Sequence, residues 1–297
     1  MSNSFLRAPA AAPASDWLSV VIPAAEPDGA VLRVDQDHPF FFDHPLDHVP
    51  GMLLVTGLLD LARAAAGARP GGHGVRLSLR FRRMCELDGP VTLRAEPVQD
   101  GRRDTFAVAA AQHGAPVCAG TIELIPADGD PPGAAGQGTS VPGGDVPVTP
   151  IAQELVHRSD VWNVVVGEPV VTRERYEAAL VSPPAGHFLL RHGAERYAAE
   201  EIVEAGRQLV TAAMHGAHRR PRDTAMLWLS VSADLPAPAH RSVPLALRWE
   251  ITPPRGGRAH FDLTLLAGGR PAGSLYYTTR CMSPVGYARF RANGGDA

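Results

Sequence analysis

Residues 38–60 read HPFFFDHPLDHVPGMLLVTGLLD, a histidine-marked loop that leads into a long apolar helix. A second stretch of the same kind follows further along the chain, with GHFLLRH at 186–192 and YAAEEIVEAGRQ at 197–208. Two copies of one pattern indicate a duplicated structural unit, and such a repeat decides the architecture before any single residue does.

The sequence after each helix repeats as well. Alternating or apolar runs at 75–85, 90–97 and 105–124 correspond to runs at 225–235, 243–251 and 260–277. In both copies a glycine and a proline, Gly114 with Pro116 and Gly269 with Pro271, separate the last two runs, as in a hairpin turn. Each copy is therefore predicted to hold two short strands, one long helix and about four antiparallel strands.

These elements predict an α+β fold of the double hotdog type, in which antiparallel strands wrap each long helix. Helices are expected near 51–67 and 198–215. The first is apolar over most of its surface, as a wrapped helix is, and the second carries Ile202, Leu209 and Ala213 on one side. We expect hotdog repeat 1 at 16–126, a linker rich in Pro and Gly at 127–150, and hotdog repeat 2 at 151–288. Residues 1–14 and the last residues are expected to be poorly ordered.

Composition limits the classes of partner. The 297 residues carry a net charge of −3 with no long basic run, so nucleic acid is not expected as a partner. No apolar stretch is long enough to span a membrane and no signal peptide is evident, which favours a cytoplasmic protein. Three scattered cysteines form no metal or disulfide pattern, and the absence of lysine excludes a lysine Schiff base. No cofactor is expected.

The second helix carries the residue with the clearest chemical potential, Glu204. It lies among apolar residues, with Arg207 three and Gln208 four positions on, on the same helix face. A buried carboxylate of this kind is either half of a structural ion pair or a general base whose pKa its surroundings set. Because Thr56 stands at the matching position of repeat 1, packing does not require the acid, and this favours the functional interpretation.

Histidines lie before both helices. His187 precedes the second helix and is a candidate catalytic residue, although a solvated histidine is common at such a place. His38 and His48 are candidate substrate-binding residues at the entrance to the first helix, where His44 and His48 show no convincing metal-ligand pattern. Gly51 opens the first helix, so a thioester carbonyl could approach its N–H groups there.

The residues now point to a family. The strings DHVPGM at 47–52, VHR at 156–158 and EAGRQ at 204–208 resemble the A-factor biosynthesis hotdog proteins, the γ-butyrolactone synthases of actinomycetes. The likeness covers both copies, which stand here in the reverse of the family's order. In this chain Thr56, Leu59 and Asp60 replace the Glu, Arg and Gln of the family's DHVPGM copy, so the site of repeat 1 is expected to be degenerate.

The resemblance implies an acyltransferase. Members join a β-ketoacyl group, carried on acyl carrier protein or coenzyme A as a thioester, to the hydroxyl of a small alcohol such as dihydroxyacetone phosphate. The expected site lies between the copies, with Glu204 as base, Arg207 orienting it, His187 beside it, and His38, His48, Gly51 and Gln208 binding substrate. No metal is expected, and the sequence leaves a homodimer open.

Two other functions stay open at this point. A hotdog dehydratase or thioesterase of a polyketide-type pathway would use the same acyl thioester and similar residues. A non-catalytic acyl-binding module would explain the loss at Thr56 in repeat 1. Acyl chain length, carrier and acceptor are not predicted by the sequence.

Overall fold

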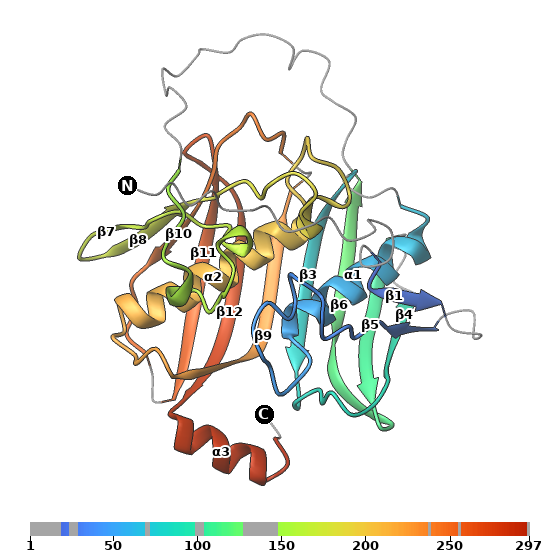
Figure 1. Cartoon of the computed structure of the whole chain (residues 1–297). Coiled ribbons are helices and arrows are strands. Elements are labelled where there is room, and N and C mark those ends of the chain that lie inside the picture. Colours follow the sequence, from blue (N-terminus) through green and yellow to red (C-terminus); the bar gives the residue numbers. More distant parts are fainter. Residues whose placement is uncertain are drawn as a thin grey trace, which may run out of the picture.

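The computed structural model describes residues 19–23, 29–68, 72–98, 104–126, 148–236, 239–254 and 257–295. The disordered N-terminus predicted at 1–14 and residues 127–147 of the predicted linker lie outside the described residues. The described part contains one antiparallel sheet of twelve strands, two long helices against it and a short C-terminal helix (Figure 1).

The strand order of the sheet shows the duplication directly. The order is β1-β2-β4-β5-β6-β3-β9-β12-β11-β10-β8-β7, and the second half mirrors the first about the β3–β9 pair. The bounds in repeat 1 are Val21–Pro23 (β1), Gly29–Leu32 (β2), His73–Phe81 (β3), Val91–Pro97 (β4), Thr105–Gln112 (β5) and Ala115–Pro126 (β6). Those in repeat 2 are Val170–Val171 (β7), Arg175–Ala179 (β8), Ala225–Leu235 (β9), Leu245–Glu250 (β10), Arg258–Ala267 (β11) and Arg270–Met282 (β12).

The hairpin turns follow from residues that tolerate a left-handed backbone. His113 and Gly114 link β5 to β6 with φ of 50° and 75°, and Gly268 and Gly269 link β11 to β12 with φ of 55° and 79°. Two consecutive positive φ angles define the tight turn that matches the twist of antiparallel strands. The turns therefore hold equivalent registers, Gln112 opposite Ala115 and Ala267 opposite Arg270.

Each half wraps one long helix. Helix α1 spans Gly51–Ala66, and its buried residues include the whole run from Met52 to Leu59. Helix α2 spans Ala199–Gly216 and is buried along nearly its full length. Burial on all sides explains why α1 is apolar over most of its surface, whereas α2 buries Glu200, Glu201 and Glu204 among its apolar residues. The double hotdog prediction is confirmed, and both helices lie within one or two residues of their predicted bounds.

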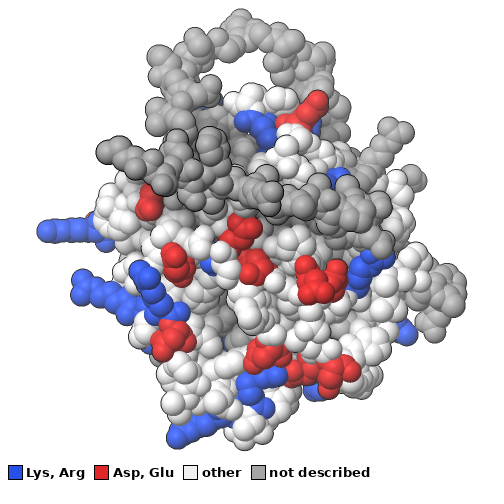
Figure 2. All heavy atoms as spheres, viewed as in Figure 1, with Lys and Arg blue, Asp and Glu red and all other residues white. Residues whose placement is uncertain are grey.

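The two halves form one continuous sheet, because β3 pairs with β9 from Val75 opposite Leu235 to Arg80 opposite Ser230. The chain end differs from expectation. Instead of fraying, it forms α3, Pro284–Ala292, whose Arg291 pairs with Glu86 of repeat 1 (Nη2 to Oε2, 2.7 Å). None of the described helices is both long enough and apolar enough to cross a bilayer. Figure 2, viewed as in Figure 1, shows that this face of the molecule carries both acidic and basic side chains.

Candidate active site

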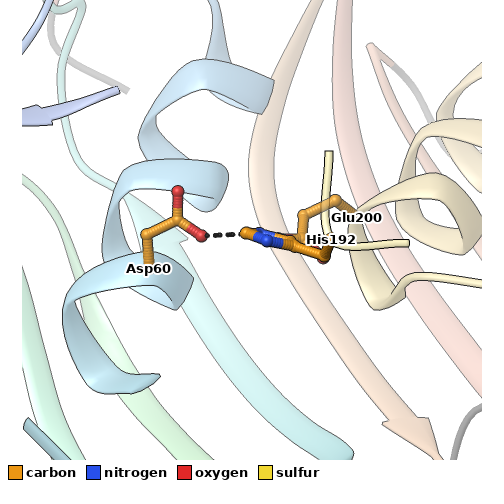
Figure 3. A group of neighbouring side chains, drawn as sticks. All are labelled: Asp60, His192 and Glu200. Carbon is orange, nitrogen blue, oxygen red and sulfur yellow. Dashed lines mark hydrogen bonds and ion pairs between the residues drawn. The ribbon is translucent and has the colours of Figure 1, made fainter. Parts of the chain in front are cut away.

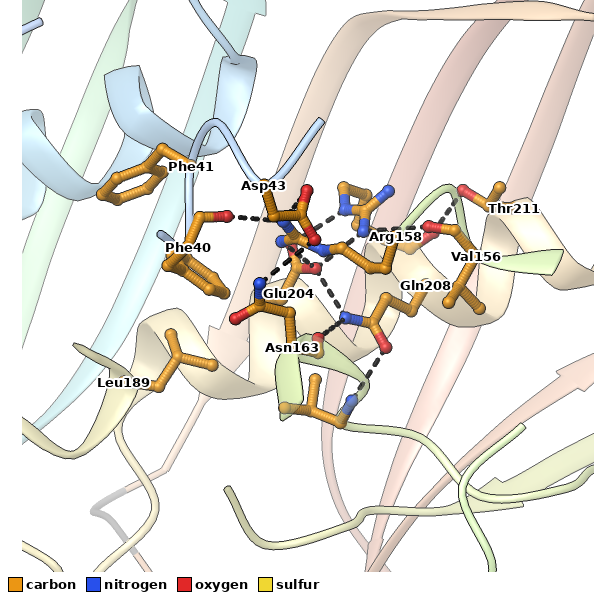
Figure 4. Close-up of polar contacts among 12 residues, drawn as sticks. Phe40, Phe41, Asp43, Val156, Arg158, Asn163, Leu189, Glu204, Gln208 and Thr211 are labelled. Atoms are coloured by element: carbon orange, nitrogen blue, oxygen red, sulfur yellow. Dashed lines mark hydrogen bonds and ion pairs between the residues drawn. The ribbon is translucent and has the colours of Figure 1, made fainter. Parts of the chain in front are cut away.

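A loop of repeat 1 packs on the segments of repeat 2 that precede helix α2. Phe40 and Phe41 of this loop are buried and pack on Phe188, with ring centroids 5.5 and 4.9 Å away. The guanidinium of Arg158 lies over the Phe40 ring at 4.7 Å, and its Nη1 donates to the Phe40 carbonyl at 2.6 Å. The junction of the halves is therefore a fixed, aromatic-lined seam (Figure 4).

Glu204 is the centre of a buried arginine cluster at this seam. Its Oε1 accepts hydrogen bonds from Arg158 Nη2, Arg207 Nη2 and Gln208 Nε2, each at 2.7 Å. Its Oε2 accepts one from Arg207 Nε at 2.8 Å. The carboxylate is fully buried, so these donors replace its water shell. The contacts predicted from Glu204 to Arg207 and to Gln208 on one helix face are present. Arg158, which lies outside the helix, adds a third donor.

The electrostatics fix Glu204 as an anion. Burial would raise the pKa of this carboxyl, but the charges of Arg158 and Arg207 outweigh burial and lower the pKa to about 2. An efficient general base has a pKa near the working pH, and its lone pairs must reach the substrate. Glu204 meets neither condition here, so its geometry supports an anchor for two arginines better than the predicted role of base.

Gln208 and His187 bond to neighbouring segments of the chain and do not line the cavity described below. Gln208 donates to the Asn163 carbonyl at 2.7 Å and accepts from the N–H of Val165 at 2.9 Å. His187 contacts the Asn163 side chain through Nε2 at 2.9 Å, and its Nδ1 accepts from the N–H of Leu189. Burial and the nearby Arg158 lower the pKa of His187 to about 4, so its ring stays neutral. These contacts indicate that His187 positions Asn163 and does not contact a substrate.

A carboxylate–imidazole pair from repeat 1 reaches the same cluster. Asp43 Oδ1 lies 2.6 Å from His44 Nδ1 and 3.3 Å from Arg158 Nη1, and its Oδ2 accepts from Asn163 Nδ2 at 3.1 Å. Burial would raise the pKa of Asp43, but these bonds and the Arg158 charge lower it to about 2. An ionised Asp on Nδ1 fixes the tautomer that leaves Nε2 of His44 as a proton acceptor.

A cavity of about 340 Å³ opens between this pair, the start of α1 and strand β9. Of the site residues predicted from sequence, Arg207, His48 and Gly51 line it, whereas Glu204, Gln208, His187 and His38 do not. His38 is buried, and its Nδ1 accepts from the backbone of Phe40 in a local turn. His48 lies at the mouth beside Asp47, 2.7 Å away.

The start of α1 forms part of the cavity wall. Gly51 and Met52 both line it, and neither N–H can have a partner within the helix. Pro50 provides no side-chain cap, and the first turn of α1 contains no acid, so the positive end of the helix is not neutralised there. In α2 the first turn contains Glu200 and Glu201 instead. The two helix starts are thus electrostatically different.

His157 forms a further part of the cavity wall. Its φ of 52° is rare for a residue with a side chain, and its Nε2 lies 2.9 Å from His215 Nε2. His215 Nδ1 in turn lies 3.0 Å from the Arg220 carbonyl and so donates to it. Burial and the charge of Arg207 lower the pKa of His157 to about 4. A neutral imidazole therefore lies beside the arginines.

In the other half, an ionic network lies where the segment before α2 meets helix α1. Asp60, His192 and Glu200 lie close enough to share an ion, and Figure 3 shows the contact between His192 and Asp60 with Glu200 beside it. However, Arg63 and Arg191 both donate to Glu200, at 3.0 Å from Arg63 Nη2 and 2.8 Å from Arg191 Nη2. A cation would have to displace these guanidinium groups. The network is therefore better explained as an ionic contact that joins the two repeats than as a metal site.

Comparisons with known proteins identify the family of the chain. The family model described as the A-factor biosynthesis hotdog domain matches residues 15–128 and 142–283, which is most of the chain and includes both repeats. The chain belongs to the A-factor biosynthesis hotdog family. The resemblance predicted from the DHVPGM, VHR and EAGRQ strings is confirmed.

Curated members of this hotdog family share a shorter region with the chain. A 2-oxo-3-(phosphooxy)propyl 3-oxoalkanoate synthase of Streptomyces virginiae is 45% identical over 67 residues, 23% of this chain and 22% of the relative. The enzyme of the same name from Streptomyces griseus is 40% identical over 85 residues, 28% of this chain and 27% of the relative. The matched region spans about a quarter of these relatives.

Solved structures support the hotdog architecture. The dehydratase domain of the CurJ module of curacin polyketide synthase has a TM-score of 0.60 at 12% identity, covering 89% of this chain and 96% of that domain. A thioesterase-like protein of Novosphingobium aromaticivorans has a TM-score of 0.58 at 18% identity, with 88% and 98% covered. At these identities the likeness concerns the fold alone.

Sequence reasoning missed three contributors to the site: Asp43, His44 and Arg158. A signal for them existed, because repeat 1 contains two Asp-His pairs, at 43–44 and 47–48, and the VHR string holds Arg158. What the sequence lacked was the distance between these segments. Arg158 reaches both Asp43 and Glu204, 115 and 46 positions away along the chain.

Proposed function

We propose that the protein is an acyltransferase that moves a β-ketoacyl group from a carrier thioester to the hydroxyl of a small phosphorylated alcohol. One observation carries the proposal. A single cavity holds an uncapped helix start at Gly51, an imidazole oriented by a buried Asp43, and the guanidinium of Arg207. These are the groups that transfer to an alcohol requires: an oxyanion site, a base and a cation.

In the proposed reaction, His44 Nε2 takes the proton of the acceptor hydroxyl as its oxygen attacks the thioester carbon. The new C–O bond forms, and the N–H groups of Gly51 and Met52 stabilise the negative oxygen of the tetrahedral intermediate. The C–S bond then breaks, and the proton on His44 passes to the leaving thiolate. Asp43 stays ionised throughout and stabilises the imidazolium.

Arg207 supplies the site for an anionic group of the acceptor. Glu204 binds its Nε and Nη2, which fixes the plane of the guanidinium while the residue still lines the cavity. A guanidinium held in this way recognises phosphate oxygens with defined geometry. The acceptor suggested by the Streptomyces relatives, whose name contains a phosphooxy group, fits this chemistry.

Hydrolysis of the thioester is the second candidate. The same His44–Asp43 pair would activate water as readily as an alcohol, and the cavity mouth includes exposed residues such as Asp47. Dehydration is favoured less, because it needs an acid that exchanges protons with the substrate, and Glu204 is saturated by arginine and amide donors. A binding module would need none of the oriented proton acceptors.

The test is product analysis. The purified protein is incubated with a β-ketoacyl coenzyme A thioester, with and without dihydroxyacetone phosphate, and products are identified by mass spectrometry. The proposal expects one ester formed per thiol released, and little thiol release without the acceptor. Equal thiol release in both samples would establish hydrolysis instead, and thioester binding without any release would favour the binding module.

A further inference from the structure

The cavity has two chemically different parts. One part is polar and contains His44, His157, Arg158 and Arg207. The other is mostly apolar, with Arg83 as a charged member, and its apolar side chains come from the start of α1 and from the facing strands and loops: Met52, Leu54, Phe81, Met84, Met226, Leu227 and Trp228. A substrate with a charged head and a fatty tail must place its tail in the apolar part, because burying the tail against charged groups would gain nothing.

Trp228 is a half-buried aromatic residue of the apolar part that contacts three neighbouring elements. Its ring lies 5.6 Å from Phe81 on β3 and 5.5 Å from Tyr277 on β12, which are the strands on either side of β9. On the helix side, a methyl group added at Gly51 would lie only 3.1 Å from Cε3 of the indole. With neighbours on three sides, the indole cannot rotate away without moving a strand or the helix.

The indole separates the cavity from the interior of repeat 2. Behind it, the Tyr277 ring is fully buried, and its hydroxyl donates to the Val203 carbonyl of α2 at 2.7 Å. The same hydroxyl lies where a side chain on Gly206 would have to be, at 2.4 Å from such a carbon. Trp228 is therefore one aromatic layer between the cavity and a packed helix–sheet interface.

From this placement, and resting on the proposed function, we infer that Trp228 limits the length of the acyl chain. With the thioester carbon at the N–H groups of Gly51, the chain enters the apolar part and meets the face formed by Trp228 and Phe81. Longer chains must displace an indole that its neighbours hold in place. Removing the indole opens space toward Tyr277, so longer chains gain contacts while short chains gain none.

The test is a series of β-ketoacyl coenzyme A thioesters from butanoyl to dodecanoyl, with non-reactive thioether analogues of the same lengths for calorimetry. The proteins are the wild type, Trp228→Ala, Trp228→Phe and, as matched control, Trp162→Ala, which removes an indole that is 51% exposed. A pocket that rejects one extra methylene discriminates by about 10-fold or more. We expect Trp228→Ala to raise dodecanoyl over hexanoyl preference at least about 10-fold in kcat/KM and in binding.

Trp228→Phe should shift the preference in the same direction by less, and Trp162→Ala should not shift it. An unchanged preference in folded Trp228→Ala would overturn the inference. If that variant does not fold, an unchanged preference in Trp228→Phe would do so. A shift in analogue binding without turnover by the wild type would uphold the length limit and reject the acyltransferase. Turnover by the wild type, with an unchanged length preference in the Trp228 variants, would uphold the acyltransferase and reject the length limit.

Discussion

Replacing Glu204 by Gln tests whether this carboxylate anchors the arginine cluster. The amide keeps the shape but removes the negative charge that faces Arg158 and Arg207, and its NH2 group cannot accept the hydrogen bond that Oε2 receives. Leaving buried charges without their partner costs about 3–5 kcal/mol. Lowering the pKa from 4.5 to about 2 corresponds to about 3 kcal/mol, a consistent magnitude.

The assay is denaturant unfolding at neutral pH, with the free energy extrapolated to water. We expect Glu204→Gln to lose about 3 kcal/mol. The control is Glu177→Gln, which breaks a partly exposed pair with Arg248 (2.7 Å) and should cost under about 1 kcal/mol. Because the folded-state pKa is lowered, the stabilisation is complete above pH 4.5 and is lost as the pH falls toward 2. A loss below about 1 kcal/mol in Glu204→Gln would refute the anchor.

Three further predictions concern single residues. Arg207→Gln should raise the KM for a phosphorylated acceptor at least about 10-fold, and more than it raises the KM for the thioester, as measured by steady-state kinetics. An equal effect on both KM values would contradict an acceptor site at Arg207. Thr56→Val should stabilise the protein by about 1 kcal/mol in thermal unfolding, because the Thr56 hydroxyl is buried without a hydrogen-bond partner in the described structure, and a loss of stability would contradict this. Burial raises the pKa of Cys118 to about 12, so alkylation at pH 8 should label it only after unfolding; rapid native labelling, detected by mass spectrometry, would disprove its burial.

The fold was predictable because its determinants are local and occur twice. Turn residues such as Gly114 and Gly269, and the apolar residues of α1, determine elements within a few residues of where they form. Helix α3 escaped prediction because none of its residues is buried. An ion pair between Arg291 and Glu86 attaches it, and such pairs leave no periodic pattern in a sequence.

The site was predictable only where one helix carries it. The spacing of Glu204, Arg207 and Gln208 indicates one helix face, and their mutual hydrogen bonds agree with that. The partners from other segments, Arg158 and Asp43, depend on how the repeats pack, and residue spacing contains no information on that packing. The prediction therefore found the anchored cluster and missed the imidazole placed beside it.

The central claim is that the cavity beside His44 is an active site, whereas the corresponding place beside His192 is not, and that His44 is the base. The most direct measurement compares kcat/KM of His44→Ala with that of His192→Ala. His192 lies 148 positions after His44, the offset that also relates Thr56 to Glu204, and it contacts Asp60 at 3.3 Å in the ionic network. Both variants must first melt cooperatively. Loss of a general base costs about 100-fold or more, so the account predicts that loss for His44→Ala and less than about threefold for His192→Ala. Similar values for the two variants, whether both low or both unchanged, would contradict it.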